Sequence, residues 1–456
     1  MTMLPEPPLS GTEMWRVLST TTNHATAAYN NPYFSAYELN QRYDKDVVKG
    51  QLKLKWDVTN KLSLQGRFSG VINKLFEDRE SPKSYLNYGD PPEGDYKTWN
   101  NACVNIDNDV LLSHHNQPGS DFVFTLNAGA STFYHRYQQE YNATDGLIVP
   151  EVYSLNNSAG NFIASTYLQE RAIRSVYGMA NLDWKDALFL TVAARNDWSS
   201  TLSTLNNSYY YPSVSLSGLV SNMIKMPEIV DYLKVYGSWA EVSSDLNPYQ
   251  IAPVYANSGS YGGLPRITYP SGIVNPAIEP EKSISLEVGL ASQLLKSRLG
   301  FDFPYYQVVD ENQILDLSIS EASGFTSRKV NGNQYTTEGF ELILNAVPVK
   351  SSRLQWSTQL NLSHMVKRLS GIYGGEEKYG NYSLNERIDN FYSTAWMKAP
   401  EGSLILNETT GLPVRDPFPR AFGHSEPDLR FGWTNSLKFG KLDIQVDFDG
   451  MFLSKS

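Results

Sequence analysis

Several features that would assign this chain to a common class are missing from its sequence. Its 456 residues include one cysteine, Cys103, which excludes a disulfide within the chain and a metal knuckle built from several thiols. The longest apolar stretches, such as residues 188–194, fall far short of the about 18 residues that a membrane-spanning helix needs. Basic clusters are also lacking, and together with a net charge of −10 this excludes a nucleic-acid-binding surface.

Motifs for catalysis and metal binding are equally scarce. The six histidines form no H-E-x-x-H pair, and His114 and His115 would face opposite sides of a strand because they are adjacent. The acidic stretch 107–109 lacks the glycine and the distal glutamate of a calcium loop. No G-x-S-x-G elbow and no phosphate-binding glycine loop occurs. The sequence therefore predicts no enzyme activity, no cofactor and no metal site.

What the sequence does contain is a repeated alternation of apolar and polar residues. The clearest example is the stretch 442–449, whose apolar members are Leu442, Ile444, Val446 and Phe448 and whose polar members are Asp443, Gln445, Asp447 and Asp449. Because successive side chains of a strand point to opposite faces, this strand has one apolar and one carboxylate-bearing face. Such a strand is typical of a barrel wall with hydrocarbon outside and water inside.

The connectors between such stretches alternate between short and long. We expect about fourteen strands, at residues 46–57, 61–73, 103–116, 121–137, 171–184, 188–198, 209–221, 232–244, 282–293, 297–309, 335–346, 354–365, 429–439 and 442–452. Links within each pair are short, including a Pro-Gly turn at 117–120, and only 222–231 is longer, with a short helical turn. Links between pairs are mostly long. The pattern predicts an all-β fold, an antiparallel transmembrane β-barrel with short periplasmic turns and long extracellular loops.

Several segments together resemble one family. They are Arg-Asn-Asp-Trp-Ser-Ser-Thr-Leu at 195–202, Tyr-Pro-Ser-Val-Ser at 211–215, Tyr-Gly-Ser-Trp-Ala-Glu-Val at 236–242, Glu-Pro-Glu-Lys at 279–282, Thr-Glu-Gly-Phe-Glu at 337–341 and Gly-His-Ser-Glu-Pro-Asp at 423–428. In order and spacing the sequence is similar to the SusC/RagA family of TonB-dependent transporters from Bacteroidetes. The last segment departs from the family's Gly-Asn-Pro-x-Pro-Asp element, because His424 and Ser425 replace its Asn and first Pro.

The resemblance implies a 22-stranded barrel that is plugged by an N-terminal domain. On this basis residues 1–45 are the end of an extracellular loop, and residues 46–456 are a partial barrel with about 14 of the 22 strands. The plug domain and the remaining strands are absent, and the sequence has neither a signal peptide nor a terminal aromatic residue. We therefore expect a fragment of a transporter.

The resemblance also implies a function in the outer membrane. Members of the family import oligosaccharides or peptides, with a SusD-like lipoprotein as the lid and the TonB complex as the energy source through the missing N-terminal part. The mechanism is binding and gated translocation, in contact with outer-membrane lipid. Two alternatives stay open: a TonB-dependent siderophore receptor, and a secreted all-β carbohydrate-binding protein such as a propeller, whose repeats of about 40–50 residues are not found.

Aromatic residues in the long connectors are the candidate ligand contacts, because aromatic faces stack on sugar C–H groups and on apolar peptide side chains. The candidates for substrate binding are Tyr96, Trp99, Tyr261, Tyr373 and Trp396. For any single member, packing within its own loop is an alternative explanation. Trp198 is assigned to an aromatic girdle at a strand end, which leaves Arg195 and Asp197 facing the lumen or the rim.

Overall fold

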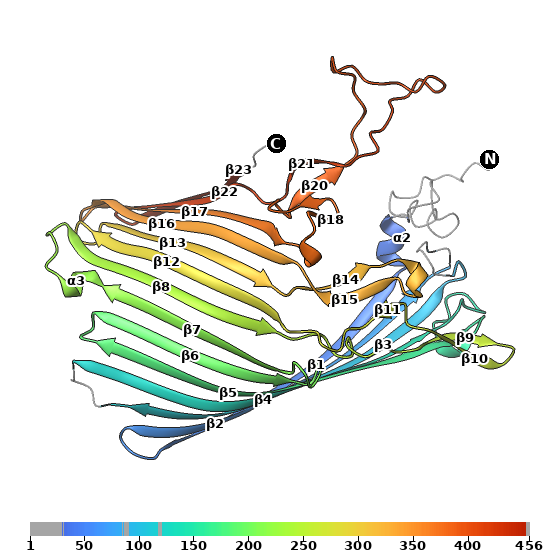
Figure 1. Cartoon of the computed structure of the whole chain (residues 1–456), viewed down its shortest axis with the longest axis horizontal. Helices are drawn as coiled ribbons and strands as arrows, with labels where there is room; N and C mark the ends of the chain where they lie inside the picture. Colours follow the sequence, from blue (N-terminus) through green and yellow to red (C-terminus); the bar gives the residue numbers. More distant parts are fainter. Residues whose placement is uncertain (1–29, 31, 84, 86–90, 117–120, 453–456) are drawn as a thin grey trace. The chain divides into compact units, whose positions relative to one another are not determined.

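The computed structural model describes residues 30, 32–83, 85, 91–116 and 121–452 (Figure 1). The chain forms two compact units, of which unit 1 comprises Met1–Leu54, Gln65–Val110 and Ser131–Ile173, and unit 2 comprises Lys55–Leu64, Leu111–Ala130 and Arg174–Ser456. In the part of the chain that is described, no helix is both long and apolar enough to cross a membrane.

Fourteen long strands make up one sheet, and each strand pairs with the next long strand along the chain. They are β1 (Asn40–Asp57), β2 (Leu62–Ser81), β3 (Asp95–His115), β4 (Phe122–Ala143), β5 (Ile163–Trp184), β6 (Leu188–Ser199), β7 (Ser208–Leu219), β8 (Val230–Ser244), β12 (Glu281–Leu294), β13 (Leu299–Glu311), β16 (Gln334–Lys350), β17 (Leu354–Gly371), β22 (Leu429–Phe439) and β23 (Leu442–Phe452). The predicted all-β fold and its fourteen strands are confirmed.

The connectors keep the predicted parity. Short turns at 58–61, 185–187, 295–298, 351–353 and 440–441 join the members of a pair, while longer segments at 144–162, 245–280, 312–333 and 372–428 join one pair to the next. Lys185 and Asp186 have φ angles of 56° and 50°, which a two-residue hairpin of the right twist requires. The β7–β8 link contains the helix α3 (Val220–Met223), which begins two residues before the segment 222–231 where a helical turn was expected. The predicted Pro-Gly turn lies outside the described residues.

Unit 2 shows that the two faces of the sheet differ. On β12, Leu286, Val288 and Leu290 are between 36% and 50% exposed, and across the ladder Leu290 lies between Val235 of β8 and Phe303 of β13. The opposite face carries Glu287 beside Tyr306. Among the described residues, the buried apolar cluster consists of Leu202, Tyr209, Leu246 and Ile278, at the loop end of the sheet. We call the two faces the apolar face and the polar face.

Strand β6 shows the same division at its loop end. Trp198 is 40% exposed on the face that it shares with the exposed Val192. Arg195 and Asp197 lie on the other face, where the guanidinium Nε donates to Asp197 Oδ1 at 2.7 Å and the Tyr211 phenol donates to Asp197 Oδ2 at 2.7 Å. The prediction of an aromatic residue at the strand end, opposite the two charged residues, is confirmed.

Several strands are longer at their loop ends than the sequence predicted. Strand β1 begins at Asn40 instead of residue 46, β2 ends at Ser81 instead of residue 73, and β3 begins at Asp95 instead of residue 103. The prediction that Tyr96 and Trp99 lie in a loop was therefore wrong, because both belong to β3. These strand ends are rich in charged residues that still pair in the ladder, so the apolar alternation stops before the strand does.

The long connectors contain structure of their own that the sequence did not predict. These elements are the helix α2 (Pro32–Tyr37), the single turns η1 (Leu155–Asn157), η2 (Glu321–Ser323) and η3 (Tyr373–Gly375), and the strands β9 (Ala256–Tyr261), β10 (Leu264–Thr268), β11 (Gly272–Ile273), β14 (Ile314–Ser318), β15 (Ser327–Asn331), β18 (Lys378–Tyr379), β19 (Tyr382–Ser383), β20 (Asn390–Ser393) and β21 (Arg420–His424). Strand β15 pairs with both β14 and β11.

Candidate functional site

The connector between β17 and β22 first folds back along the end of β17. The Leu369 amide donates to Glu386 O at 2.9 Å, the Asn385 amide donates to Leu369 O at 2.6 Å, and the Ile388 amide donates to Lys367 O at 3.1 Å. Residues 385–388 therefore continue the sheet for a few residues, which fixes the start of the connector to a strand of unit 2.

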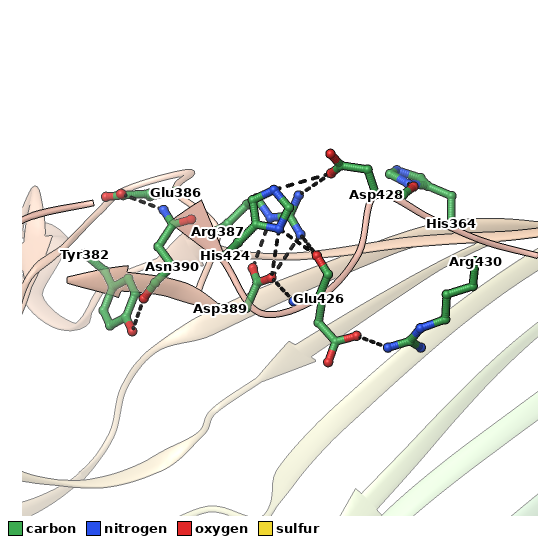
Figure 2. A network of polar contacts seen from close by, with 10 residues as sticks. All are labelled: His364, Tyr382, Glu386, Arg387, Asp389, Asn390, His424, Glu426, Asp428 and Arg430. Atoms are coloured by element: carbon green, nitrogen blue, oxygen red, sulfur yellow. Dashed lines mark hydrogen bonds and ion pairs between the residues drawn. The ribbon is translucent and has the colours of Figure 1, made fainter. Parts of the chain in front are cut away.

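Arg387 is the centre of a polar network at this point (Figure 2). Its guanidinium forms two parallel bonds to Asp389, from Nε to Oδ1 at 3.0 Å and from Nη2 to Oδ2 at 2.9 Å. Nη1 donates to Asp428 Oδ1 at 2.9 Å, and Nη2 also donates to Glu426 O at 3.2 Å. The Glu426 amide returns a bond to Asp389 Oδ2 at 3.0 Å. One cation thus joins the two ends of the long connector, in the planar geometry that only arginine provides.

The segment 423–428 supplies the other half of this network. His424 Nδ1 lies 2.6 Å from Glu426 O, and its Nε2 lies 3.5 Å from Asp428 Oδ1. Asp428 is tied to the sheet in turn, because its amide donates to Phe452 O at 2.8 Å and its carbonyl oxygen lies 2.5 Å from His364 Nδ1. The motif that departs from the family pattern at His424 and Ser425 is therefore an anchor for the connector.

A second carboxylate, Glu386, accepts hydrogen bonds on the other side of the anchor. The Ser383 amide donates to Oε2 at 2.8 Å, Asn390 Nδ2 donates to Oε1 at 2.9 Å, and the Tyr392 hydroxyl donates to Oε1 as well. Burial raises the pKa of Glu386, but these three donors outweigh it and hold that pKa below its ordinary value. Burial, followed by the bond to Glu386, raises the pKa of Tyr392 to about 12.

Asp389 and Arg387 stabilise each other's charged form, which shifts their two pKa values in opposite directions. Burial disfavours the Asp389 carboxylate, but the Arg387 guanidinium and the Glu426 amide together lower the pKa of Asp389. The hydrogen bond to Asp389 raises the pKa of Arg387. At neutral pH, Glu386 and Asp389 are therefore ionised, Arg387 is protonated and Tyr392 is neutral, as their hydrogen bonds require. We refer to residues 385–390 with 424–428 as the loop base.

Beyond the loop base, the connector forms an exposed arm, residues 394–419. Strands β20 and β21 pair as antiparallel neighbours, and the arm continues past them and projects away from the sheet (Figure 1). Backbone bonds from Met397 to Val414, from Ile405 to Met397 and from Val414 to Ile405 join three segments of the arm into a small sheet. Large apolar side chains are exposed along the arm and the two strands, namely Phe391, Trp396, Leu404, Ile405, Leu406, Leu412, Phe418 and Phe422.

The structure places three of the predicted ligand contacts in connectors of unit 2. Trp396 lies in the arm, is 48% exposed, and has the Arg415 guanidinium 5.8 Å from its ring centroid. Tyr261 ends β9, in the β9–β10 hairpin, and is 85% exposed. Tyr373 belongs to η3, and its amide donates to Asn333 Oδ1 at 3.2 Å. These contacts have no partner in common.

The other two predicted contacts lie on β3 in unit 1 and point to opposite faces of it. The Tyr96 hydroxyl donates to Asp78 Oδ2 at 3.4 Å, and Asp78 also accepts from Arg42. The Trp99 ring packs on Tyr141, with ring centroids 5.3 Å apart. Tyr96 is next to Asp95, which is fully buried and pairs with Lys97 at 2.9 Å. Within the described residues, the five aromatic candidates are thus held by separate sets of neighbours.

Sequence reasoning missed Arg387, Asp389 and Glu386, although one signal was available. The spacing Arg-x-Asp occurs at 42–44, 195–197 and 387–389. In an extended segment, residues two apart share a face, so that an arginine and an aspartate at this spacing can pair with each other. The second and third pairs do so, at 2.7 Å and 2.9 Å, whereas Arg42 bonds to Asp78 instead. In the described ranges, no group of three or more His, Cys, Asp or Glu side chains is arranged to hold a metal ion.

An antiparallel sheet with one exposed apolar face, one polar face and connectors that mostly alternate between short and long is typical of the wall of a transmembrane β-barrel. The comparison with protein families agrees, because residues 9–416 match the family described as TonB dependent receptor-like, beta-barrel. The chain belongs to this family, and the protein is located in the outer membrane, as predicted.

Individual relatives are distant and longer. TonB-dependent receptor P26 of Formosa agariphila is 23% identical over 470 residues, covering 92% of this chain and 46% of that protein. TonB-dependent receptor P3 of the same organism is 23% identical over 335 residues, covering 65% of this chain and 33% of that protein. The chain therefore spans about half the length of the first relative and a third of the length of the second.

Solved structures show the same fold. The RagAB peptide transporter superposes with a TM-score of 0.76 at 15% identity, over 92% of this chain and 49% of the matched one. The RagAB peptide importer in its 'open-open' state superposes with a TM-score of 0.77. The resemblance to TonB-linked transporters of the SusC and RagA type is confirmed at the level of family and fold.

Proposed function

We propose that this chain belongs to an importer of the SusCD type, which binds oligosaccharides or peptides and translocates them across the outer membrane. The observation that carries the proposal is the match of 92% of the chain to the RagAB fold, together with the family assignment. In this proposal the TonB complex supplies the energy and acts through a part of the whole protein outside residues 46–456. The substrate is bound and released without covalent chemistry.

The arm supports the second part of the proposal, which is a SusD-like lipoprotein as a lid. The arm and the two strands at its base expose eight large apolar side chains, and exposed apolar surface of this kind is typical of a protein interface. The loop base fixes the arm to β17 and β22 through Arg387, so that the apolar surface is held at the loop end of the sheet. We propose that the arm contacts the lipoprotein, whereas the assignment of residues 1–45 to an extracellular loop stays a prediction.

For the substrate itself, we retain Tyr261, Trp396 and Tyr373 as proposed contacts, with Tyr96 and Trp99 on β3. Trp396 is the best placed of them, because its ring is exposed while Arg415 lies beside it. A ring of this kind stacks on a sugar or on an apolar peptide side chain, and the guanidinium adds a hydrogen-bond donor for a hydroxyl or a carboxylate.

The proposal is tested by uptake in the bacterium that encodes the whole protein. Deletion of the gene should abolish uptake of one fluorescent oligosaccharide or peptide, and the wild-type gene should restore it. Trp396→Ala should weaken uptake about two- to tenfold, which corresponds to the about 0.5–1.5 kcal/mol that an aromatic contact contributes. Trp433→Phe on the apolar face of β22 is the control and should leave uptake unchanged.

Two results would count against the proposal. If the deletion strain grows normally on glycans and peptides and takes them up normally, the protein does not import these substrates. Loss of iron–siderophore uptake instead would identify the protein as a siderophore receptor. If the lipoprotein still co-purifies with a variant that lacks residues 394–419, the arm is not its contact.

A further inference from the structure

The apolar face of unit 2 is not smooth but carries a hollow of about 590 Å³ across β6, β7, β8 and β12. Its walls are the side chains of Leu188, Leu216, Met223, Val235, Trp239 and Val288. Volumes of this size are typical of sites for small molecules. The hollow is open to the surroundings of the barrel wall, and every wall named here is apolar.

Two glycines, Gly218 and Gly237, create this hollow. Gly237 lies on β8 between Leu216 of β7 and Val288 of β12, where each neighbouring position carries a large side chain. A Cβ at Gly237 would lie 3.4 Å from Glu287 O and 3.6 Å from Val288 Cγ1, which are ordinary contacts. The fold therefore does not require a glycine at this position, and the space above it is left for something else.

One end of the hollow is at α3, in the link between β7 and β8. Met223 of α3 forms the wall there, and α3 is tied to the adjacent β5–β6 turn by a bond of 2.7 Å from Asn222 Nδ2 to Asp186 O. The exposed Lys225 and Glu228 follow within five residues of Met223. The link between β7 and β8 thus carries a cation and an anion two and five residues after the wall residue Met223.

We propose that this hollow binds one glycerophospholipid of the inner leaflet, with an acyl chain over Gly237 and the phosphate near Lys225. The hollow is continuous with the membrane-facing surface, so that the neighbouring material is hydrocarbon and not water. The charges near its end complement a zwitterionic phosphoethanolamine group, with Lys225 for the phosphate and Glu228 for the ammonium. A side chain at position 237 would occupy the place of the acyl chain.

The proposal is tested by native mass spectrometry of the full chain, purified from membranes in a mild detergent. We expect one phospholipid to stay bound to the wild-type protein when all others have been removed. Gly237→Leu, which fills the hollow, should lower the bound fraction at least tenfold. Val446→Leu adds bulk to the same face outside the hollow, and should leave the bound fraction unchanged.

Further variants separate the parts of the proposal and guard against misfolding. If Gly237→Leu does not fold, as judged by circular dichroism and heat-dependent migration in gels, Gly237→Val and Met223→Ala take its place. Lys225→Ala should reduce retention several-fold for added phosphatidylethanolamine and phosphatidylglycerol alike, whereas Glu228→Gln should reduce it for phosphatidylethanolamine alone. Equal retention by the wild type and by every folded variant at the hollow would overturn the proposal, as would the absence of any retained lipid.

Discussion

At the scale of single residues, two glycines on neighbouring strands differ in whether the fold requires them: Gly289 on β12 is required, whereas Gly237 on β8 is not. Gly289 on β12 lies under the ring of Tyr236, and a Cβ there would come within 2.2 Å of Tyr236 Cζ. The same ring donates from its hydroxyl to Asp302 Oδ1 at 2.9 Å. Tyr177 covers Gly129 and Tyr306 covers Gly339 in the same way. A glycine is therefore required wherever an aromatic ring lies flat across the polar face.

This close approach predicts a large effect of one methyl group. Gly289→Ala should destabilise the folded sheet by about 1–3 kcal/mol, because the ring of Tyr236 must leave its position. The measurement is equilibrium unfolding by guanidinium in detergent micelles. Gly237→Ala is the matched control on the neighbouring strand and should change stability by less than about 1 kcal/mol, because its Cβ meets ordinary contacts.

A double variant distinguishes a clash between the methyl group that Gly289→Ala adds and the Tyr236 ring from a general intolerance of alanine at position 289. Gly289→Ala combined with Tyr236→Ala should cost less than the sum of the two single changes, with a coupling of about 0.5–3 kcal/mol. Additive costs would show that the ring and the glycine are independent.

At the scale of elements, the sequence predicted the strands far better than the connectors. Strand β12 was expected at 282–293 and spans Glu281–Leu294. The agreement is close because the alternation of apolar and polar residues is a local pattern that the sequence itself contains. The pairing of residues 385–388 with the end of β17 depends on contacts that no local periodicity records. Strand β11 likewise pairs in parallel with β15, which is over fifty residues away in the chain.

The candidate site was less predictable than the fold for a related reason. Its anchor motif at 423–428 was visible in the sequence, but its partner Arg387 lies in a polar connector where one charged residue resembles another. Trp396 was selected because it is aromatic and in a long connector, and the structure does place it on an exposed arm. Tyr96 was selected by the same rule and proved to be a strand residue. Which charged side chains pair is set by the tertiary fold.

The loop base predicts how acid affects this element. The pKa values of Glu386 and Asp389 lie below their ordinary values of 4.5 and 3.8, so both carboxylates stabilise the folded connector at neutral pH. That contribution is complete above the ordinary values and is lost as the pH falls through the lowered ones. Hydrogen exchange, corrected for intrinsic rates, should show protected amides at Ser383 and Glu426 at pH 6 and weaker protection below pH 3.8.

Isosteric variants provide the control for this pH dependence. Glu386→Gln should weaken protection of the Ser383 amide already at pH 6, and Asp389→Asn should do the same for Glu426. The Gly440 amide, which donates to Arg353 O in a turn without a carboxylate acceptor, serves as the reference. Protection at Ser383 and Glu426 that follows Gly440 across the whole pH range would contradict the assigned role.

At the scale of the whole molecule, aromatic residues set the height of the hydrophobic band. Trp198 lies at the loop end of β6, and Trp184, 43% exposed, ends β5 at the adjoining turn. The ten steps from Leu188 to Trp198 at about 3.4 Å each, tilted by about 45°, give a height of roughly 24 Å. This agrees with the apolar band of about 25 Å in outer-membrane barrels.

The band makes the effect of a charge depend on the face that carries it. Val288, in the middle of β12 and 50% exposed on the apolar face, lies near the midplane of the band. Val288→Arg should therefore cost about 2–4 kcal/mol when the protein is folded into phospholipid vesicles, because the guanidinium would lie in hydrocarbon. Glu287→Arg, one residue away on the polar face, should cost about 1 kcal/mol or less, since its side chain stays in water. Equal costs for the two variants, measured by urea titration of vesicle-folded protein, would mean that the apolar face of unit 2 does not contact lipid.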